Sequence, residues 1–170
     1  MNFDKGTPTI ANRSFRIGAV FILLLLTSSC VVAENKNSSM KTFFQKTTSE
    51  QIDDFGRHQI EEQYELIYFG NKIVHPPAVY LISNFAKNGQ AAVPLLEMKL
   101  ESSRDDSEIR DIVMIFSEMS VQGSYLIPCE SKTMFMLDKK ISSLNSLWKP
   151  SLENAIQEMK LRNCPPSKRT

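Results

Sequence analysis

The sequence predicts an all-α protein, built as a short stack of about six antiparallel helices. Apolar residues recur at helical spacing along most of the chain after residue 48. Glycine, proline and capping residues divide that pattern into short segments, which favours helical hairpins over long helices. The only extended candidates are residues 73–74 and 125–127, and neither is long enough to predict a sheet.

The first helix is expected over about residues 49–69. Thr48 and Gln51 fit a capping box at its start, and residues 70–71, Gly-Asn, are placed to end it. Gly56 lies in the middle of this segment, where glycine costs about 1 kcal/mol relative to alanine. A bend or a break is therefore expected there.

The central stretch, residues 76–119, predicts three short helices joined by tight turns. Pro94 is tolerated because it falls in a first turn. Gly89 suits a left-handed helix end, and Asp105 with Glu108 fits a capping box. The inward stripes are Ala78, Leu81, Ile82 and Phe85; Val93, Leu96 and Leu100; and Ile109, Ile112, Val113, Phe116 and Met119.

A loop over residues 120–130 and two further helices complete the predicted stack. The first of these is expected over about residues 131–145, and the second begins at Pro150. Trp148 is expected to close the hairpin between them. The run Met134-Phe135-Met136 is interpreted as core. The residues expected to face inward are Met134, Leu137, Ile141, Leu144, Leu152, Ile156 and Met159.

A weak internal repeat relates the first and third of the central helices, whose apolar stripes superpose with one constant offset. Residues 92–96, AVPLL, resemble the start of the second helix of a HEAT-type repeat, and residues 106–110, DSEIR, resemble the opening of a HEAT first helix. The resemblance covers roughly a third of the chain and includes no catalytic residue. It implies that Asp106 caps its helix, that Ile109 faces inward and that Arg110 reaches a neighbouring repeat. It also implies a stack that binds proteins.

Residues 1–33 predict an export signal. Two arginines precede an uninterrupted apolar run at residues 17–26, and small polar residues follow at 27–29 before Cys30. This ending resembles a bacterial lipobox and implies lipid attachment at Cys30. Cleavage after Ala33 and an uncleaved membrane anchor are the alternatives.

The remaining organisation follows from composition. Residues 34–48 are interpreted as a polar tether, residues 49–164 as the helical domain and residues 165–170 as a frayed tail.

The 170 residues are 42% hydrophobic and 23% charged, with a formal net charge of +1. Nucleic acid is not an expected partner, because phosphate binding needs a clustered basic excess. The predicted location is the bacterial envelope, lipid-anchored or periplasmic.

Cys129 and Cys164 flank the last predicted hairpin. Export to an oxidising compartment favours a disulfide between them. If Cys30 carries lipid, these two cysteines remain as an even pair. Two buried free thiols are the alternative.

The first functional hypothesis is a non-catalytic protein-binding module, and one version of it is an immunity-type inhibitor of a toxin. No nucleophile elbow, phosphate loop, HExxH or CxxC motif is present, and no cofactor is expected. Asp111 and Glu118 are expected to be exposed on the side opposite the binding face, and an internal contact between repeats is the alternative for Asp111. The residues predicted to contact the partner are Glu97, Lys99, Glu101 and Arg104.

The alternative is an envelope hydrolase or metal-dependent enzyme that uses His58 or His75. Asp54, His58 and Glu62 recur at helical spacing, so they would share one helix face and could begin a metal site. A solvated polar face is the plainer interpretation, because no other ligand cluster accompanies them. His75 precedes two prolines and is expected at a turn.

Overall fold

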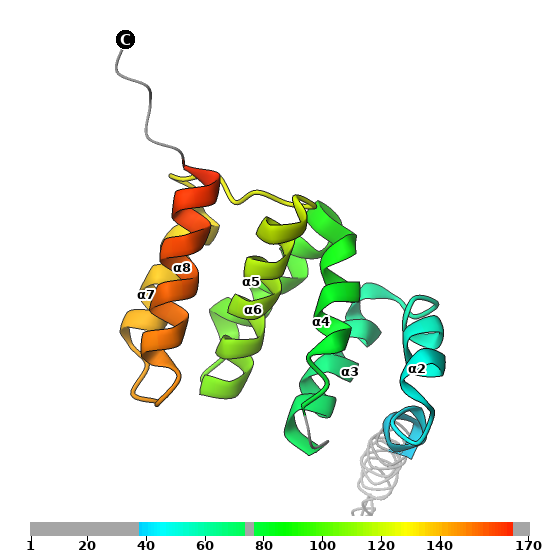
Figure 1. Cartoon of the computed structure of the whole chain (residues 1–170). Coiled ribbons are helices and arrows are strands. Elements are labelled where there is room, and N and C mark those ends of the chain that lie inside the picture. The colour runs from blue at the N-terminus through cyan, green and yellow to red at the C-terminus, as the bar shows by residue number, and fades with distance from the viewer. Residues whose placement is uncertain (1–37, 74–76, 165–170) are drawn as a thin grey trace, which may run out of the picture. The chain divides into compact units, whose positions relative to one another are not determined.

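The computed structural model describes residues 38–73 and 77–164 of the chain (Figure 1). The chain divides into two compact units after Phe43. Of the first unit the structure describes residues 38–43, which are helical, although the sequence predicted a polar tether there. The second unit, from Phe44 onward, contains the predicted helical domain.

The second unit is all-α, and no strand occurs among its described residues. This confirms the predicted fold class. Of the two extended candidates, Ile73 belongs to a helix while residue 74 lies outside the described residues, and residues 125–127 are irregular. The elements are α2 (Thr48–Phe55), α3 (Ile60–Ile73), α4 (Tyr80–Phe85), the 3-10 helix η1 (Ala86–Ala92), α5 (Val93–Ser102), α6 (Asp106–Gln122), α7 (Lys132–Ser142) and α8 (Lys149–Asn163).

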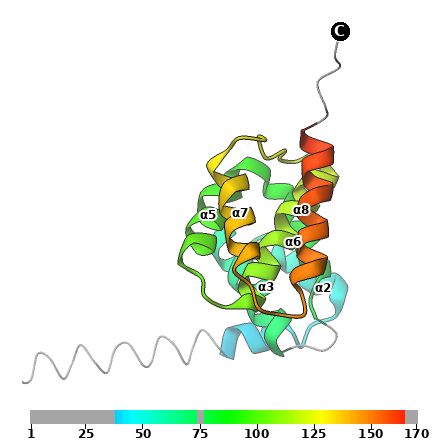
Figure 2. The same cartoon turned by 90° about the vertical axis from the view of Figure 1, so that its left-hand side faces the viewer.

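The helices of the second unit form two layers (Figures 1 and 2). Helix α6 packs between α4 and α8 in the first layer, and α2 contacts α4. Helices α3, α5 and α7 form the second layer, in which α5 packs against α7. Successive helices run antiparallel, so the connections alternate between two ends. The lower end in Figure 1 carries residues 77–79, 103–105 and 143–148.

The core lies between the two layers and consists of the predicted apolar stripes. Every residue named above for the three central stripes is buried, and so is every residue expected to face inward from the last two helices, from Met134 to Met159 in the list above. Tyr64, Phe85 and Phe116 are among the largest side chains that are completely enclosed. Ile115 is also enclosed, although it falls outside the predicted stripe. Helix α6 is covered over a wider arc than its apolar spacing indicates, because it has neighbours on both sides.

The helix predicted over residues 49–69 is two helices separated at Gly56. Gly56 is the C-cap of α2, and α3 begins at Ile60. The capping box starts one residue earlier than predicted: the Thr47 hydroxyl accepts the Glu50 N–H, and the Glu50 carboxylate accepts the Thr47 N–H at 2.9 Å. Each short helix can then turn its own apolar residues toward the core.

Gly70 does not end α3, which continues to Ile73. A Cβ atom at Gly70 would lie 2.5 Å from the Phe44 ring and 2.9 Å from the Ala78 side chain. Glycine therefore serves here for close packing inside a helix rather than as a stop. The Phe44 ring lies 6.1 Å from the ring of Phe69, which places the start of the second unit against the last turns of α3.

Asp105, rather than Asp106, is the N-cap of α6, and its carboxylate accepts the Ser107 N–H at 2.9 Å. Glu108 does not complete a capping box, because its carboxylate accepts a hydrogen bond of 2.8 Å from the buried Tyr64 hydroxyl of α3. This hydrogen bond between α3 and α6 replaces the hydrogen bond within α6 that a capping box would make. Ile109 is buried, as the HEAT resemblance implied.

The predicted 120–130 loop is shorter at its start, because α6 extends to Gln122. Gly123 then ends the helix in the left-handed conformation, with φ of 69°. Gly89 has φ of 51°, which confirms the positive φ expected there, but it lies inside η1 after α4 has ended at Phe85. Helix α7 stops at Ser142, three residues before the predicted end at residue 145.

Candidate binding surface

The four predicted partner contacts fall into two groups. Glu97 and Lys99 are half-buried ties between neighbouring helices of the second layer. Glu97 accepts a hydrogen bond from the Thr133 hydroxyl of α7. The Lys99 ammonium lies 2.9 Å from the Glu65 carboxylate of α3 and 5.0 Å from the centre of the Tyr64 ring. These two side chains hold α5 in its layer.

Glu101 and Arg104 are the exposed members of the set. The Glu101 carboxylate lies 3.7 Å from the Lys132 ammonium, so the pair crosses from α5 to α7 on the outer face. Arg104 lies in the loop between α5 and α6, at the lower end. The structure therefore does not bring all four residues together on one face.

Sequence reasoning missed two large exposed apolar side chains on the second layer. Met98 of α5 is 55% exposed and Phe135 of α7 is 68% exposed. The prediction that Phe135 belongs to the core is wrong, whereas Met134 beside it is buried. The sequence could have indicated that Phe135 is exposed, because on a helix Phe135 lies opposite the apolar stripe that contains Leu137.

We call the outer face of these two helices the α5–α7 surface. It combines exposed apolar and charged side chains, and the Glu101–Lys132 pair joins its two helices. We define it by five exposed residues: Pro94, Met98, Glu101, Lys132 and Phe135.

Asp111 and Glu118 were both predicted to be exposed. Asp111 instead lies in the interior, and Glu118 lies in a contact between α6 and α4. Asp111 is only 3% exposed and accepts bonds of 2.9 and 2.7 Å from the Arg110 guanidinium. Burial raises the pKa of Asp111, and the Arg110 hydrogen bonds oppose that rise. Glu118 is half-buried and accepts from the Ser83 hydroxyl at 3.0 Å. Asp111 flanks Ile115 on α6, and the wider buried arc of this helix includes both.

His58 lies between α2 and α3, not within one helix as its spacing predicted. Its ring contacts both expected carboxylates, at 3.7 Å from Asp54 and 3.1 Å from Glu62. The Lys46 ammonium bonds to Asp54 at 2.7 Å and is the main cause that lowers the pKa of Asp54. Even so, within residues 38–73 and 77–164 no group of three His, Cys, Asp or Glu side chains is arranged so that it could hold a metal ion. His75 lies outside the described residues.

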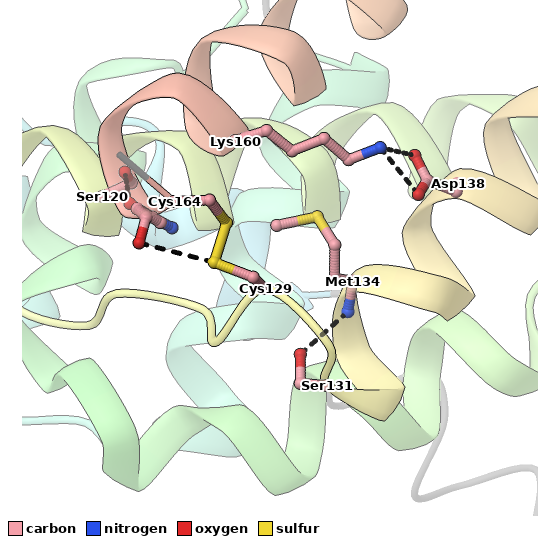
Figure 3. The surroundings of a disulfide bond; sticks show 8 residues. Ser120, Cys129, Ser131, Met134, Asp138, Lys160 and Cys164 are labelled. Atoms are coloured by element: carbon pink, nitrogen blue, oxygen red, sulfur yellow. Dashed lines mark hydrogen bonds and ion pairs between the residues drawn. A yellow bond between two sulfur atoms is a disulfide. The ribbon is translucent and has the colours of Figure 1, made fainter. Parts of the chain in front are cut away.

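Cys129 and Cys164 form a disulfide, which confirms the predicted pair over two free thiols (Figure 3). The bond joins the loop after α6 to the C-cap of α8, with 5.7 Å between the two Cα atoms. Nearby, the Lys160 ammonium bonds to the Asp138 carboxylate at 2.8 Å and ties α8 to α7. The last hairpin is thus closed covalently at one end and by an ion pair along its length.

Comparisons with protein-family models, with curated proteins and with solved structures found no match to this chain. Among the helices of the described ranges, none has both the length and the apolar character that crossing a membrane requires. The predicted export signal at residues 1–33, with Cys30, and the tail at residues 165–170 lie outside those ranges.

Proposed function

We propose that this chain is an exported, membrane-tethered and non-catalytic module of the bacterial envelope, which binds a protein through its α5–α7 surface. The observation that carries this proposal is the exposure of Met98 and Phe135 on the same layer, with the Glu101–Lys132 pair between their helices. Methionine and aromatic side chains are enriched at protein interfaces, whereas charged side chains are typical of their rims.

The internal ties of α5 support a rigid surface rather than an adaptable one. Glu97 and Lys99 attach this helix to α7 and α3 respectively, so the exposed Met98 between them is presented from a fixed backbone. Binding to a preorganised surface avoids the entropy cost of ordering it. Stacked helical hairpins commonly bind proteins in this way.

The Cys129–Cys164 disulfide supports export, because disulfides persist in oxidising compartments and are rare in the cytosol. It agrees with the signal predicted at residues 1–33. The lipid attachment expected at Cys30 would then hold the module at a membrane, with the α5–α7 surface available to a soluble or membrane-bound partner.

The binding surface is tested by capture of partners from native envelope, with the tethered chain as bait. Met98→Asp combined with Phe135→Asp should abolish capture of a partner that the unchanged chain retains. The matched control is Met114→Asp with Val121→Asp, because these are exposed apolar residues of α6 in the first layer. The control pair should retain the partner. Equal loss from both pairs, with unchanged thermal unfolding, would contradict a binding surface confined to the second layer.

The tether is tested by fractionating cells that express a Cys30→Ser variant. Lipid attachment at Cys30 predicts that the variant leaves the membrane fraction, because the thioether bond to lipid cannot form. Membrane retention with an unprocessed N-terminus would identify a helical anchor instead. A soluble, processed wild-type protein would contradict the tether.

A further inference from the structure

Exposed apolar side chains gather at the lower end of the second unit. Leu147 is 97% exposed and Trp148 is 48% exposed, in the loop between α7 and α8. Ile73 at the end of α3 and Val79 just before α4 are exposed at the same end. A side chain as exposed as Leu147 makes almost no contact with its own chain, so packing within the second unit does not explain it.

The loop that carries Leu147 and Trp148 is held in place by its neighbours. Leu144 is buried beneath it, and the Lys149 ammonium donates to the Ser142 carbonyl oxygen at 2.8 Å. The Arg110 guanidinium lies 5.0 Å from the centre of the Trp148 ring and covers one of its faces. The loop therefore projects its apolar residues outward from a fixed base.

Basic side chains outnumber acidic ones around these apolar residues. Arg104 and Lys139 are exposed, and Lys140 donates to the carbonyl oxygens of Glu101 and Ser103 at 3.0 and 2.7 Å. The ionisable residues of segments 71–73, 77–79, 102–106 and 139–150 are Lys72, Arg104, Asp105, Asp106, Lys139, Lys140 and Lys149.

The chain also enters the second unit at this end. Phe44, its first residue, stacks against Phe69 in the last turns of α3. From Cys30 to Phe44 the chain spans at most about 50 Å when fully extended. An anchor at Cys30 would therefore keep the lower end within about 50 Å of the membrane, which is within reach of docking.

We propose that the lower end is a membrane-docking surface for an anionic leaflet, in addition to the tether. Leu147 and Trp148 insert at the boundary between headgroups and acyl chains, where tryptophan rings are favoured. Arg104 and Lys139 lie among anionic headgroups. This inference rests on the membrane tether proposed above. The helices would then stand on the membrane, with the α5–α7 surface along the side of the stack.

Trp148 is the single tryptophan of the chain, so its fluorescence reports this loop alone. Full-length protein purified from the membrane fraction is reconstituted into vesicles of phosphatidylethanolamine and phosphatidylglycerol. The expected result is a blue shift of Trp148 emission and its quenching by lipids brominated near the headgroup. Vesicles of phosphatidylcholine alone should give weaker quenching, because they lack the anionic charge.

Leu147→Asp should restore emission to the unquenched level while the chain still sediments with the vesicles. Phe135→Asp is the matched control, because it makes the same kind of change on the α5–α7 surface, and it should leave quenching unchanged. Arg104→Glu with Lys139→Glu should reduce quenching only in the anionic vesicles.

Unshifted and unquenched Trp148 in wild-type protein that does sediment with vesicles would overturn membrane docking and leave the tether intact. A wild-type chain that neither sediments nor shows quenching would overturn both proposals. Quenching that Leu147→Asp leaves unaltered would also reject docking, because the inserted residue would then not matter.

Discussion

At the residue scale, the buried Asp111 carboxylate and its Arg110 partner explain why a charge is tolerated inside a small all-α unit. Both bonds from the guanidinium go to the same carboxylate oxygen, at 2.9 and 2.7 Å. A buried charge without such a partner would cost several kcal/mol. Arg110 also covers Trp148, so the pair links α6 to the loop before α8.

Replacement of Asp111 should change how stability depends on pH. Its pKa is raised in the folded state by burial, whereas the unfolded value is about 4. Between the two values the folded chain keeps a proton that the unfolded chain loses, so the stability that Asp111 contributes falls as pH rises through this window. Urea unfolding of wild type and Asp111→Asn, followed from about pH 4 upward, should show the stability of wild type falling relative to that of the variant.

Asp105 provides a control in which stability changes with pH in the opposite direction. The Lys72 hydrogen bond is the main cause that lowers the pKa of Asp105 to about 2. The stability it contributes is present above the unfolded pKa of about 4 and is lost as pH falls toward the folded value. Wild type should therefore lose its advantage over Asp105→Asn on acidification. A pH-independent difference between wild type and Asp111→Asn would show that the Asp111 carboxylate titrates alike in both states.

At the scale of the element, the glycines at helix ends and breaks differ in backbone conformation and in the space around them. Gly123 closes α6 in open space, and Gly89 brings η1 close to the chain after α6. A Cβ atom at Gly89 would lie 2.5 Å from the Ser124 carbonyl oxygen. Gly56 has an ordinary helical φ of −66° and room for a side chain.

Alanine substitutions at these glycines should form a graded series in thermal unfolding. Gly56→Ala should change stability by less than about 0.5 kcal/mol, because neither strain nor a clash arises. Gly123→Ala should cost about 1 kcal/mol for the left-handed conformation alone. Gly89→Ala should cost about 2 kcal/mol or more, since a backbone clash is added to the positive φ. The assignment of Gly89 to a close approach would be wrong if Gly89→Ala cost no more than Gly123→Ala.

At the scale of the whole second unit, stability comes from stacking along two layers rather than from any single helix. Helix α6 contacts both α4 and α8. Helices as short as α4, with 6 residues, and α5, with 10 residues, are marginal in water on their own. The last hairpin has a neighbour on one side only, and there the Cys129–Cys164 disulfide adds a covalent tie.

Removal of this disulfide should destabilise the whole unit. The two cysteines are 35 residues apart, and closing a loop of that size restricts the unfolded chain by an amount worth about 4 kcal/mol. Cys129→Ser with Cys164→Ser should lower the urea midpoint accordingly, relative to oxidised wild type. Reductant should bring wild type down to the level of the double variant and leave the variant unmoved. Two freely alkylatable thiols in the non-reduced native protein would contradict the premise.

The residues that sequence alone identified correctly are those whose role is set by local spacing. The stripes that include Leu81, Leu96 and Ile112 were predicted from periodicity, because a helix places residues three and four apart on one face whatever surrounds it. The disulfide was predictable from the cysteine count and the export signal. The α5–α7 surface was predictable only in part: Glu101 is exposed there, whereas Glu97 is committed to Thr133.

Tertiary packing alone decided the rest, because burial depends on neighbours that are distant in sequence. Gly56 and Gly70 look alike in sequence, yet Gly56 ends a helix where a side chain would fit, whereas Gly70 lets Ala78 pack closely. Asp111 and Glu101 are both acidic residues on amphipathic helices, but α6 has helices on both sides and α5 has an outer face open to solvent. Helical periodicity determined which segments form helices, whereas the stacking of those helices determined which charges are interior and which apolar residues remain exposed for a partner.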